Sequence, residues 1–149
     1  MKIYIGSDEA GFEMKGEIIG FLKTNNYDVV DCGCYDKNPV LYPEVATDLS
    51  EKVAADAGSR GILICGTGIG MAMAANKVKG IRAAVCHDIL SVERSVLSNN
   101  AQIMCMGARI IAPFTALKFV ELWLGLTFKD GSSTPKVKAI TDYESKHIG

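Results

Sequence analysis

The chain has 149 residues, 48% of them hydrophobic, and its 16 basic residues nearly balance its 17 acidic ones, for a formal net charge of −1. This length can form a core without disulfide or metal support, so we expect a single domain over residues 1–149. The balanced charge argues against a nucleic-acid or anionic-lipid surface, and no apolar stretch reaches the roughly 20 residues of a membrane span.

Short runs rich in β-branched residues alternate with longer segments of helical periodicity. The predicted strands are residues 3–5, 28–30, 61–65, 82–86 and 103–106. The first predicted helix has an apolar stripe over residues 12–22 and stops at Asn25. The second begins at Pro43, and later helices are predicted over residues 89–97, 115–124 and 137–147.

This alternation of strands and helices predicts an α/β fold with a parallel sheet. We expect three layers, with an open five-stranded sheet of Rossmann-like or flavodoxin-like order 2-1-3-4-5 and a C-terminal helix. Ligands of such sheets bind beyond the carboxyl ends of the strands, where the strand order reverses. Residues 7–11 and 66–70 follow the first and third strands, so the candidate site is expected between them.

The third predicted strand runs into three alternating glycines, Gly66, Gly68 and Gly70, before a helix that begins near Met71. Glycines permit positive φ and close approach to a ligand, and a helix N-terminus adds partial positive charge, so the loop is a candidate anion cradle. Phosphate, carboxylate or enediolate would suit it. Nucleotide binding is the weaker interpretation, because Met71 and Ala72 break both common nucleotide motifs.

Cys65 is the last residue of that strand and lies beside the positive potential of the loop, an environment that lowers a thiol pKa. It could act as a base, and Thr67 could hydrogen-bond the thiolate or a substrate oxygen. An ordinary buried strand thiol stays open as an alternative. Asp8, after the first strand, could cap the first helix or serve the site.

A set of motifs extends over nearly the whole chain. They are Gly6-Ser7-Asp8 with Gly11, Tyr42-Pro43, residues 61–70, 74–77 and 80–86, Asn99, residues 107–109, Trp123-Leu124 and residues 137–140. In these motifs the chain resembles the ribose-5-phosphate isomerase B and galactose-6-phosphate isomerase group. The resemblance implies an aldose–ketose isomerase without metal or cofactor, which opens the sugar ring and moves a proton between C2 and C1 through a cis-enediolate.

The resemblance also implies roles for particular residues. Cys65 matches the proton-shuttling base, and Asp8 matches a carboxylate that opens the ring and orients the substrate. Thr67 and the loop amides would stabilise the enediolate. The implied substrate contacts are Tyr42, Gly66, Gly68, Ile69, Gly70 and Asn99. Family members are dimers with shared active sites, so a homodimer is implied, and ribose 5-phosphate is the leading substrate.

The chain departs from the family where the sugar ring is opened and the phosphate is held. Glu9 stands where ribose-5-phosphate isomerases usually have histidine, and Ser98 stands where a histidine assists ring opening. Of three typical arginines Arg109 remains, whereas Lys136 and Ser132 occupy the other positions. Lysine lacks the planar fork of arginine, so we expect a rearranged phosphate grip.

Arg94 lies four residues before Ser98 on one predicted helix, so both side chains should share a face. Its guanidinium could reach the space of the absent histidine. We therefore include Glu9, Ser98, Arg94, Arg109 and Lys136 among the candidate substrate-binding residues. An isomerase of another phosphorylated sugar or of an unphosphorylated one, and a noncatalytic partner subunit, remain alternatives.

The remaining polar residues suggest no second site. His87 follows the fourth strand, where family members usually have a small residue, and we expect a surface histidine. Cys32 and Cys34 without further ligands are a poor zinc signal. The five cysteines suggest no disulfide framework and the N-terminus no secretion signal, so a cytoplasmic protein with small-molecule partners is expected.

Overall fold

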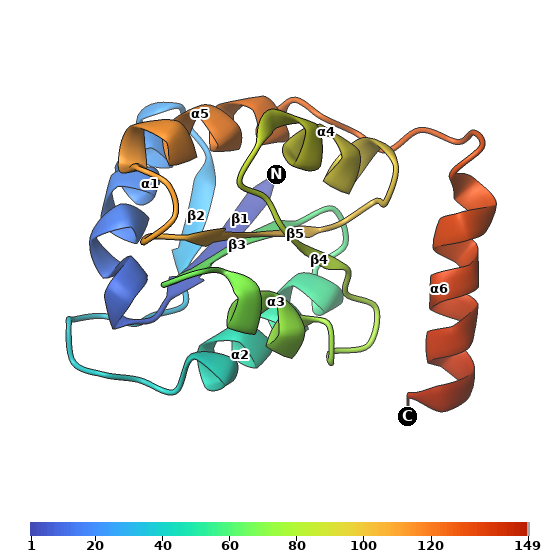
Figure 1. Cartoon of the computed structure of the whole chain (residues 1–149), viewed down its shortest axis with the longest axis horizontal. Coiled ribbons are helices and arrows are strands. Elements are labelled where there is room, and N and C mark those ends of the chain that lie inside the picture. Colours follow the sequence, from blue (N-terminus) through green and yellow to red (C-terminus); the bar gives the residue numbers. More distant parts are fainter. Residues whose placement is uncertain (149) are drawn as a thin grey trace.

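The computed structural model describes residues 1–148. Within them, five parallel strands form one sheet: β1 (Lys2–Ser7), β2 (Asp28–Asp31), β3 (Arg60–Cys65), β4 (Ala83–Val85) and β5 (Ile103–Gly107). The helices are η1 (Glu9–Gly11), α1 (Phe12–Thr24), α2 (Tyr42–Ala55), α3 (Ile69–Ala75), α4 (Ile89–Leu97), α5 (Pro113–Leu124) and α6 (Thr134–His147). The predicted α/β class, with an open parallel sheet between two helical layers and a C-terminal helix, is confirmed (Figure 1).

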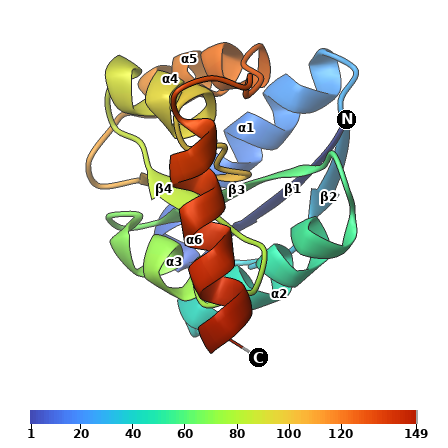
Figure 2. The ribbon, with the colours of Figure 1, turned by 90° about the vertical axis from the view of Figure 1, so that its right-hand side faces the viewer.

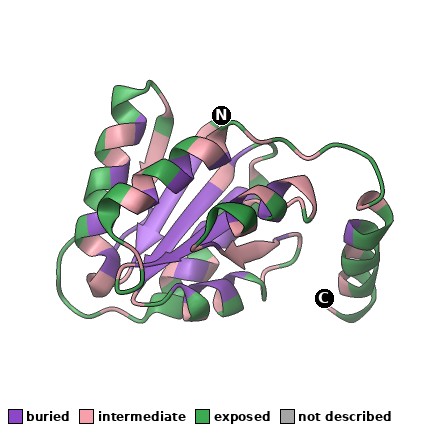
Figure 3. Ribbon diagram, turned by 45° about the horizontal axis from the view of Figure 1, so that its top comes forward, coloured by how far each residue is buried: buried purple, intermediate pink, exposed green. Residues whose placement is uncertain are grey.

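Two apolar cores cover the two faces of the sheet. Helices α1, α4 and α5 pack on one face, where Ile64 and the fully buried Trp123 belong to the same core. Helices α2 and α3 cover the other face, around Leu49, Leu63 and Met71. The burial colours show this arrangement, with buried strands at the centre and exposed outer helix faces (Figure 3).

The predicted order of the last two strands is wrong. The sheet has the order β2-β1-β3-β5-β4, not 2-1-3-4-5. The physical reason is burial, since every residue of β5 is buried, whereas the three residues of β4 are only half-buried. A short, partly exposed strand is tolerated at a sheet edge, and a fully buried one gains from neighbours on both sides.

The predicted location of the ligand crevice is unaffected by this strand order, because it depends only on β1 and β3. The connection from β1 to β2 passes through α1 on one face, and that from β2 to β3 passes through α2 on the other. Because β1 and β3 are neighbours, the strand order reverses between them, and a crevice opens at their carboxyl ends.

Helix α6 stands outside the two layers, beside β4 (Figures 1 and 2). The Glu144 carboxylate accepts a hydrogen bond from the Gly80 N–H at 2.8 Å and so ties α6 to the loop before β4. Large side chains of α6 stay exposed, including Ile140 and Tyr143. Within residues 1–148 no helix is both long enough and apolar enough to cross a bilayer.

Candidate active site

The end of β3 holds the loops on both sides of it through backbone hydrogen bonds. The Asp8 N–H donates to the Ile64 carbonyl at 3.1 Å. On the other side, the Ala108 N–H donates to the Cys65 carbonyl at 2.8 Å and the Arg109 N–H donates to the Gly66 carbonyl at 3.0 Å. The loops that follow β1 and β5 are therefore fixed around Cys65.

A hollow of about 230 Å³ opens at this point of the sheet. Its lining residues are Asp8, Tyr42, Cys65, Gly66, Thr67, Gly70 and Arg109. Cys65 ends β3, Gly70 lies in the first turn of α3 and Tyr42 begins α2, while the other residues come from the loops after β1, β3 and β5. The structure thus brings together all three predicted catalytic residues and four of the predicted substrate contacts.

Cys65 is 6% exposed, at the base of the hollow. The Gly68 N–H donates to its Sγ at 3.1 Å. Gly68 has φ +77°, and a Cβ there would lie 3.0 Å from the Met106 carbonyl carbon, so the loop needs glycine at this position. This hydrogen bond fixes the sulfur in the hollow, within reach of a bound ligand.

Thr67 does not make the predicted contact with the Cys65 sulfur. Its hydroxyl oxygen accepts from the Ile69 N–H at 3.3 Å, and the side chain is exposed at the mouth of the hollow. The amide of Gly68 takes the predicted place beside sulfur. The Thr67 hydroxyl proton stays available for a ligand oxygen.

Asp8 combines the two roles that the sequence left open. Its Oδ1 accepts from the Ala10 N–H at 3.0 Å and the Gly11 N–H at 3.2 Å, which caps η1, while the residue also lines the hollow. Burial raises the pKa of the Asp8 carboxyl above its ordinary 3.8, and Glu9 adds to the rise, although the two amides and Arg109 oppose it. The site therefore favours the neutral form of this carboxyl more than water does.

Tyr42 and Arg109 line the hollow beside the glycine loop. The Tyr42 ring lies so close to Gly70 that a Cβ at Gly70 would collide with it. Arg109 lies against Gly66 and has an exposed side chain. An aromatic wall and a cation on either side of a glycine loop suit a small polar anion.

The chain also matches known proteins. The family model described as Ribose/Galactose Isomerase matches residues 3–140. The chain belongs to the ribose/galactose isomerase family. It is 46% identical to "Ribose-5-P isomerase B" of Listeria innocua, over 99% of either chain, and 48% identical to "D-erythrulose-4-phosphate isomerase 2" of Mycolicibacterium smegmatis, over 97% of either chain. The structure of Clostridium thermocellum ribose-5-phosphate isomerase B covers 99% of both chains, with a TM-score of 0.95 and 41% identity.

Four predicted substrate contacts of this ribose/galactose isomerase family member lie away from the hollow. The Arg94 Nη1 donates to the Ser98 Oγ at 3.1 Å, which confirms that the two share a face of α4. Asn99 lines a separate hollow of about 410 Å³ that also includes Ile140 of α6, and Lys136 is exposed in the first turn of α6. In Figure 1, α6 lies on the opposite side of the molecule from the loops after β1 and β3.

Glu9, which replaces the family's usual histidine, faces the loop before α2. Its Oε2 accepts from the Val40 N–H at 3.3 Å. The carboxylate is absent from the lining of the Cys65 hollow, although its charge acts on Asp8. Within residues 1–148, no group of three or more His, Cys, Asp or Glu side chains could hold a metal ion.

The expectation of a surface histidine at position 87 is wrong. His87 is half-buried, and its Nε2 accepts a hydrogen bond from the Gly107 N–H at 2.8 Å, just before Ala108 and Arg109. An acceptor Nε2 places the proton of the neutral ring on Nδ1. Burial lowers the pKa of His87 below its ordinary 6.5, although nearby Asp88 opposes the shift. The strand order, with β4 beside β5, explains the contact.

We predict that His87 makes the fold less stable in mild acid. Since its folded pKa lies below the unfolded value of 6.5, the unfolded chain binds the proton more readily. The free energy of unfolding should therefore fall as pH drops from about 7 through 6.5 toward the folded pKa, and be level above that window. Urea unfolding at several pH values would measure the fall.

In His87→Gln this part of the fall should disappear, because glutamine stays neutral and can still accept from Gly107. His147→Gln is the control, since it removes a histidine and leaves the bond between His87 and Gly107 intact. An equal slope in the wild type and His87→Gln would contradict the assignment.

Proposed function

We propose that the chain is an aldose–ketose isomerase of sugar phosphates, in which Cys65 moves a proton between C2 and C1 through a cis-enediolate. The proposal is carried by the position of Cys65, whose sulfur receives the Gly68 N–H at 3.1 Å in a hollow that it shares with Asp8 and Arg109. A base, a carboxyl that orients the substrate hydroxyls and amides beside a developing oxyanion are what this proton transfer requires.

In the proposed reaction the Cys65 thiolate removes the proton from C2, and the electron pair moves to the carbonyl oxygen. Loop amides and the Thr67 hydroxyl stabilise the charge that develops on that oxygen. The hydroxyl proton on O2 then passes to O1 within the cis-enediolate, the carbonyl forms at C2, and the Cys65 thiol returns its proton to C1, while Asp8 orients the substrate hydroxyls. Each step uses groups of this chain, in agreement with the cofactor-free reaction that the resemblance implies.

Cys65→Ala should lower kcat by about 10² to 10⁴, the usual loss for a general base. The measurement is turnover of a sugar phosphate, together with deuterium uptake at C2 in heavy water, because a proton on an enediolate pathway exchanges with solvent. Cys105→Ala is the matched control, since that buried thiol lies in the core and outside the hollow. Near-normal turnover by Cys65→Ala would exclude the cysteine as base. A wild-type chain that neither turns over sugar phosphates nor exchanges the proton would indicate a noncatalytic partner subunit.

Two substrates are candidates. Ribose 5-phosphate follows from the family resemblance and from relatives named for it. D-Erythrulose 4-phosphate, for which another relative is named, is favoured by Ser98. A four-carbon sugar with phosphate on O4 cannot close a furanose ring, so its isomerase needs no ring-opening histidine. We favour this open-chain substrate, with the phosphate held by Arg109 and a rearranged set that includes Arg94 and Lys136.

We expect kcat/KM for the D-erythrose and D-erythrulose 4-phosphate pair to exceed that for ribose 5-phosphate at least about tenfold, since one proton-transfer group contributes about 10² or more. Ser98→His should raise turnover of ribose 5-phosphate and leave that of the tetrose phosphate unchanged. Ser98→Asn is the control for size. Higher activity of the wild type on ribose 5-phosphate would reverse our choice of substrate.

We further propose that the chain works in the cytoplasm as one domain in a homodimer with shared sites. Asn99 precedes β5 and lies at the amino-terminal edge of the sheet, whereas Cys65 ends β3 at the carboxyl edge. A five-residue strand is about 16 Å long, so one chain cannot easily bring the two together. A second copy can supply Ser98, Asn99 and Lys136 to the hollow around Cys65.

Mixing Cys65→Ala with Asn99→Ala chains should therefore restore activity that each variant lacks. In a C2 dimer about half of the mixed dimers are hybrids, and each hybrid has one intact site, so about a quarter of wild-type activity is expected. Subunits are exchanged by mild denaturation and refolding before the assay. Mixing Cys65→Ala with the double variant is the control and should give no recovery. No recovery in the first mixture would contradict shared sites.

A further inference from the structure

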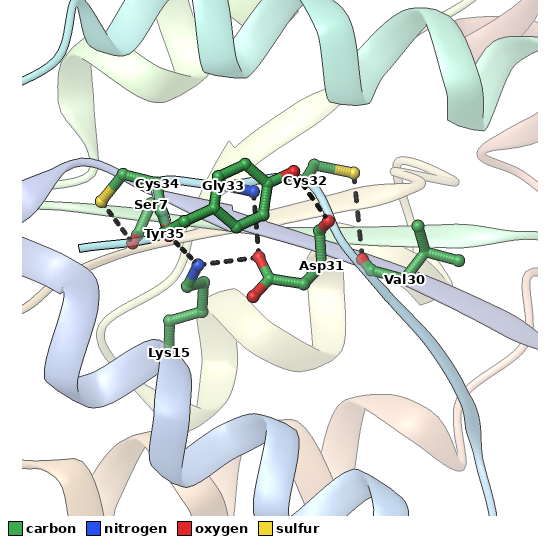
Figure 4. Close-up of polar contacts among 8 residues, drawn as sticks. All are labelled: Ser7, Lys15, Val30, Asp31, Cys32, Gly33, Cys34 and Tyr35. Carbon is green, nitrogen blue, oxygen red and sulfur yellow. Dashed lines mark hydrogen bonds and ion pairs between the residues drawn. The ribbon is translucent and has the colours of Figure 1, made fainter.

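Among residues 1–148, Lys15 is the one charged residue that is fully buried, with 1% of its surface exposed. Its ammonium group lies 2.7 Å from the Asp31 carboxylate and donates to the Cys34 carbonyl (Figure 4). The rings of Phe12 and Tyr35 lie 5.4 and 5.6 Å from it. Lys15 therefore joins α1 to residues 31–35, at the end of β2 and in the loop after it.

That segment is bonded in turn to the residue before Asp8. The Ser7 N–H donates to the Gly33 carbonyl, and the Cys34 N–H donates to the Ser7 carbonyl, each at 2.7 Å. Asp31 also accepts from the Gly33 N–H at 2.9 Å and so helps to fix the turn. A continuous path of hydrogen bonds runs from Lys15 through residues 31–34 to Ser7, which is completely buried.

A buried ammonium such as that of Lys15 is a poor choice if the residue only has to stabilise the fold. Removing an ammonium from water is energetically unfavourable, and an apolar side chain of the same size often serves a core as well. The ion pair and the carbonyl contact are directional, so they hold the backbone of residues 31–34 in one position. The role of Lys15 is thus to orient the backbone of this segment rather than to fill the core.

We propose that Lys15 is a positioning residue of the candidate site, a role that rests on the proposed isomerase function. It fixes residues 31–34 against Ser7, and through Ser7 it sets the orientation of Asp8. The same segment continues to Tyr42, the wall of the hollow beside Gly70. Loss of the ammonium frees both sides of the hollow to move relative to Cys65.

A second lysine gives a matched control. Lys37, on the same loop, pairs with Glu13 of α1 at 2.5 Å, but the two side chains are 67% and 77% exposed. Exposed ion pairs contribute little, so this contact does not fix the loop. Lys37→Met removes a cation between the same two elements without disturbing Ser7 or Asp8.

The test compares Lys15→Met with Lys37→Met at a temperature where both are folded. Hydrogen exchange of the Ser7 and Cys34 amides reports on the anchor without need of activity, and kcat and KM report on the site. We expect Lys15→Met to speed exchange of both amides and to lower kcat about tenfold or more, since displacements of about 1 Å can cost 10²-fold. Lys37→Met should change neither.

Leu22→Ala, on the same helix, separates positioning from general instability. It removes a fully buried side chain, so it should lower the melting temperature and leave kcat per folded molecule near the wild-type value. Asp31→Asn combined with Lys15→Met should lower kcat no further than Lys15→Met alone, because both act through one segment. If Lys15→Met does not fold, Lys15→Gln keeps an amide donor and should lower kcat in the same direction.

Faster amide exchange with unchanged kcat would overturn the proposal and leave the isomerase function standing. Unchanged exchange would overturn it as well, because the anchor would then not depend on Lys15. A wild type without turnover on any sugar phosphate would refute the proposed function, and the positioning role would fall with it.

Discussion

Three backbone hydrogen bonds at the end of β3 determine where the rest of the candidate site lies. They run from the amides of Asp8, Ala108 and Arg109 to the carbonyls of residues 64–66. Because the donors and acceptors are backbone atoms, the geometry depends on the pairing of β1, β3 and β5 and not on particular side chains. These bonds fix the backbone of Asp8 and Arg109, two residues of the hollow, relative to Cys65. The chemistry of the hollow therefore follows from strand order.

These three hydrogen bonds also explain why polar groups are concentrated at the carboxyl edge of the sheet. Carbonyls that accept from neighbouring loops are satisfied, while the loop after β3 still presents the Gly68 amide to a sulfur. Buried polar groups are tolerated where each has a partner. Burial raises the pKa of the Asp8 carboxyl, which is an electrostatic cost, while two backbone amides hold the carboxyl in place. The two amides thus fix the Asp8 carboxyl at the edge of the hollow.

Much of the fold could be predicted because its signals are local. Helix α4 was expected over residues 89–97 and is observed at Ile89–Leu97, where Asp88 caps it by accepting from the Ser91 N–H at 2.7 Å. The strand order has no local signal, because it depends on whether β4 or β5 is buried on both sides. That comparison needs the pairing partners, and a single sequence leaves them open. The apolar run of residues 103–106 was the available signal.

The residues of the site likewise divide into those that local signals predict and those that they do not. Cys65, Asp8 and the glycine loop could be predicted because each directly follows a strand whose carboxyl end is defined by sequence. The position of His87 cannot be predicted in this way, since its contact with Gly107 exists only when β4 lies beside β5. Lys15 could have been noticed, because it lies three residues before Ile18 and seven before Leu22, on the apolar stripe of α1. A charge on such a stripe needs a buried partner, but the sequence does not say which.

The distance between the two edges of the sheet has a consequence for how this enzyme family can diversify. In the proposed dimer, the proton-transfer groups belong to the carboxyl edge of one copy, while Ser98, Asn99 and Lys136 belong to the opposite edge of the other. Substitutions of these three residues fall on segments with no backbone hydrogen bond to the end of β3, unlike substitutions of Arg109. After gene duplication, two copies could divide the work, one keeping the thiol and the other keeping recognition. The fold thus lets substrate range evolve while the reaction itself is preserved.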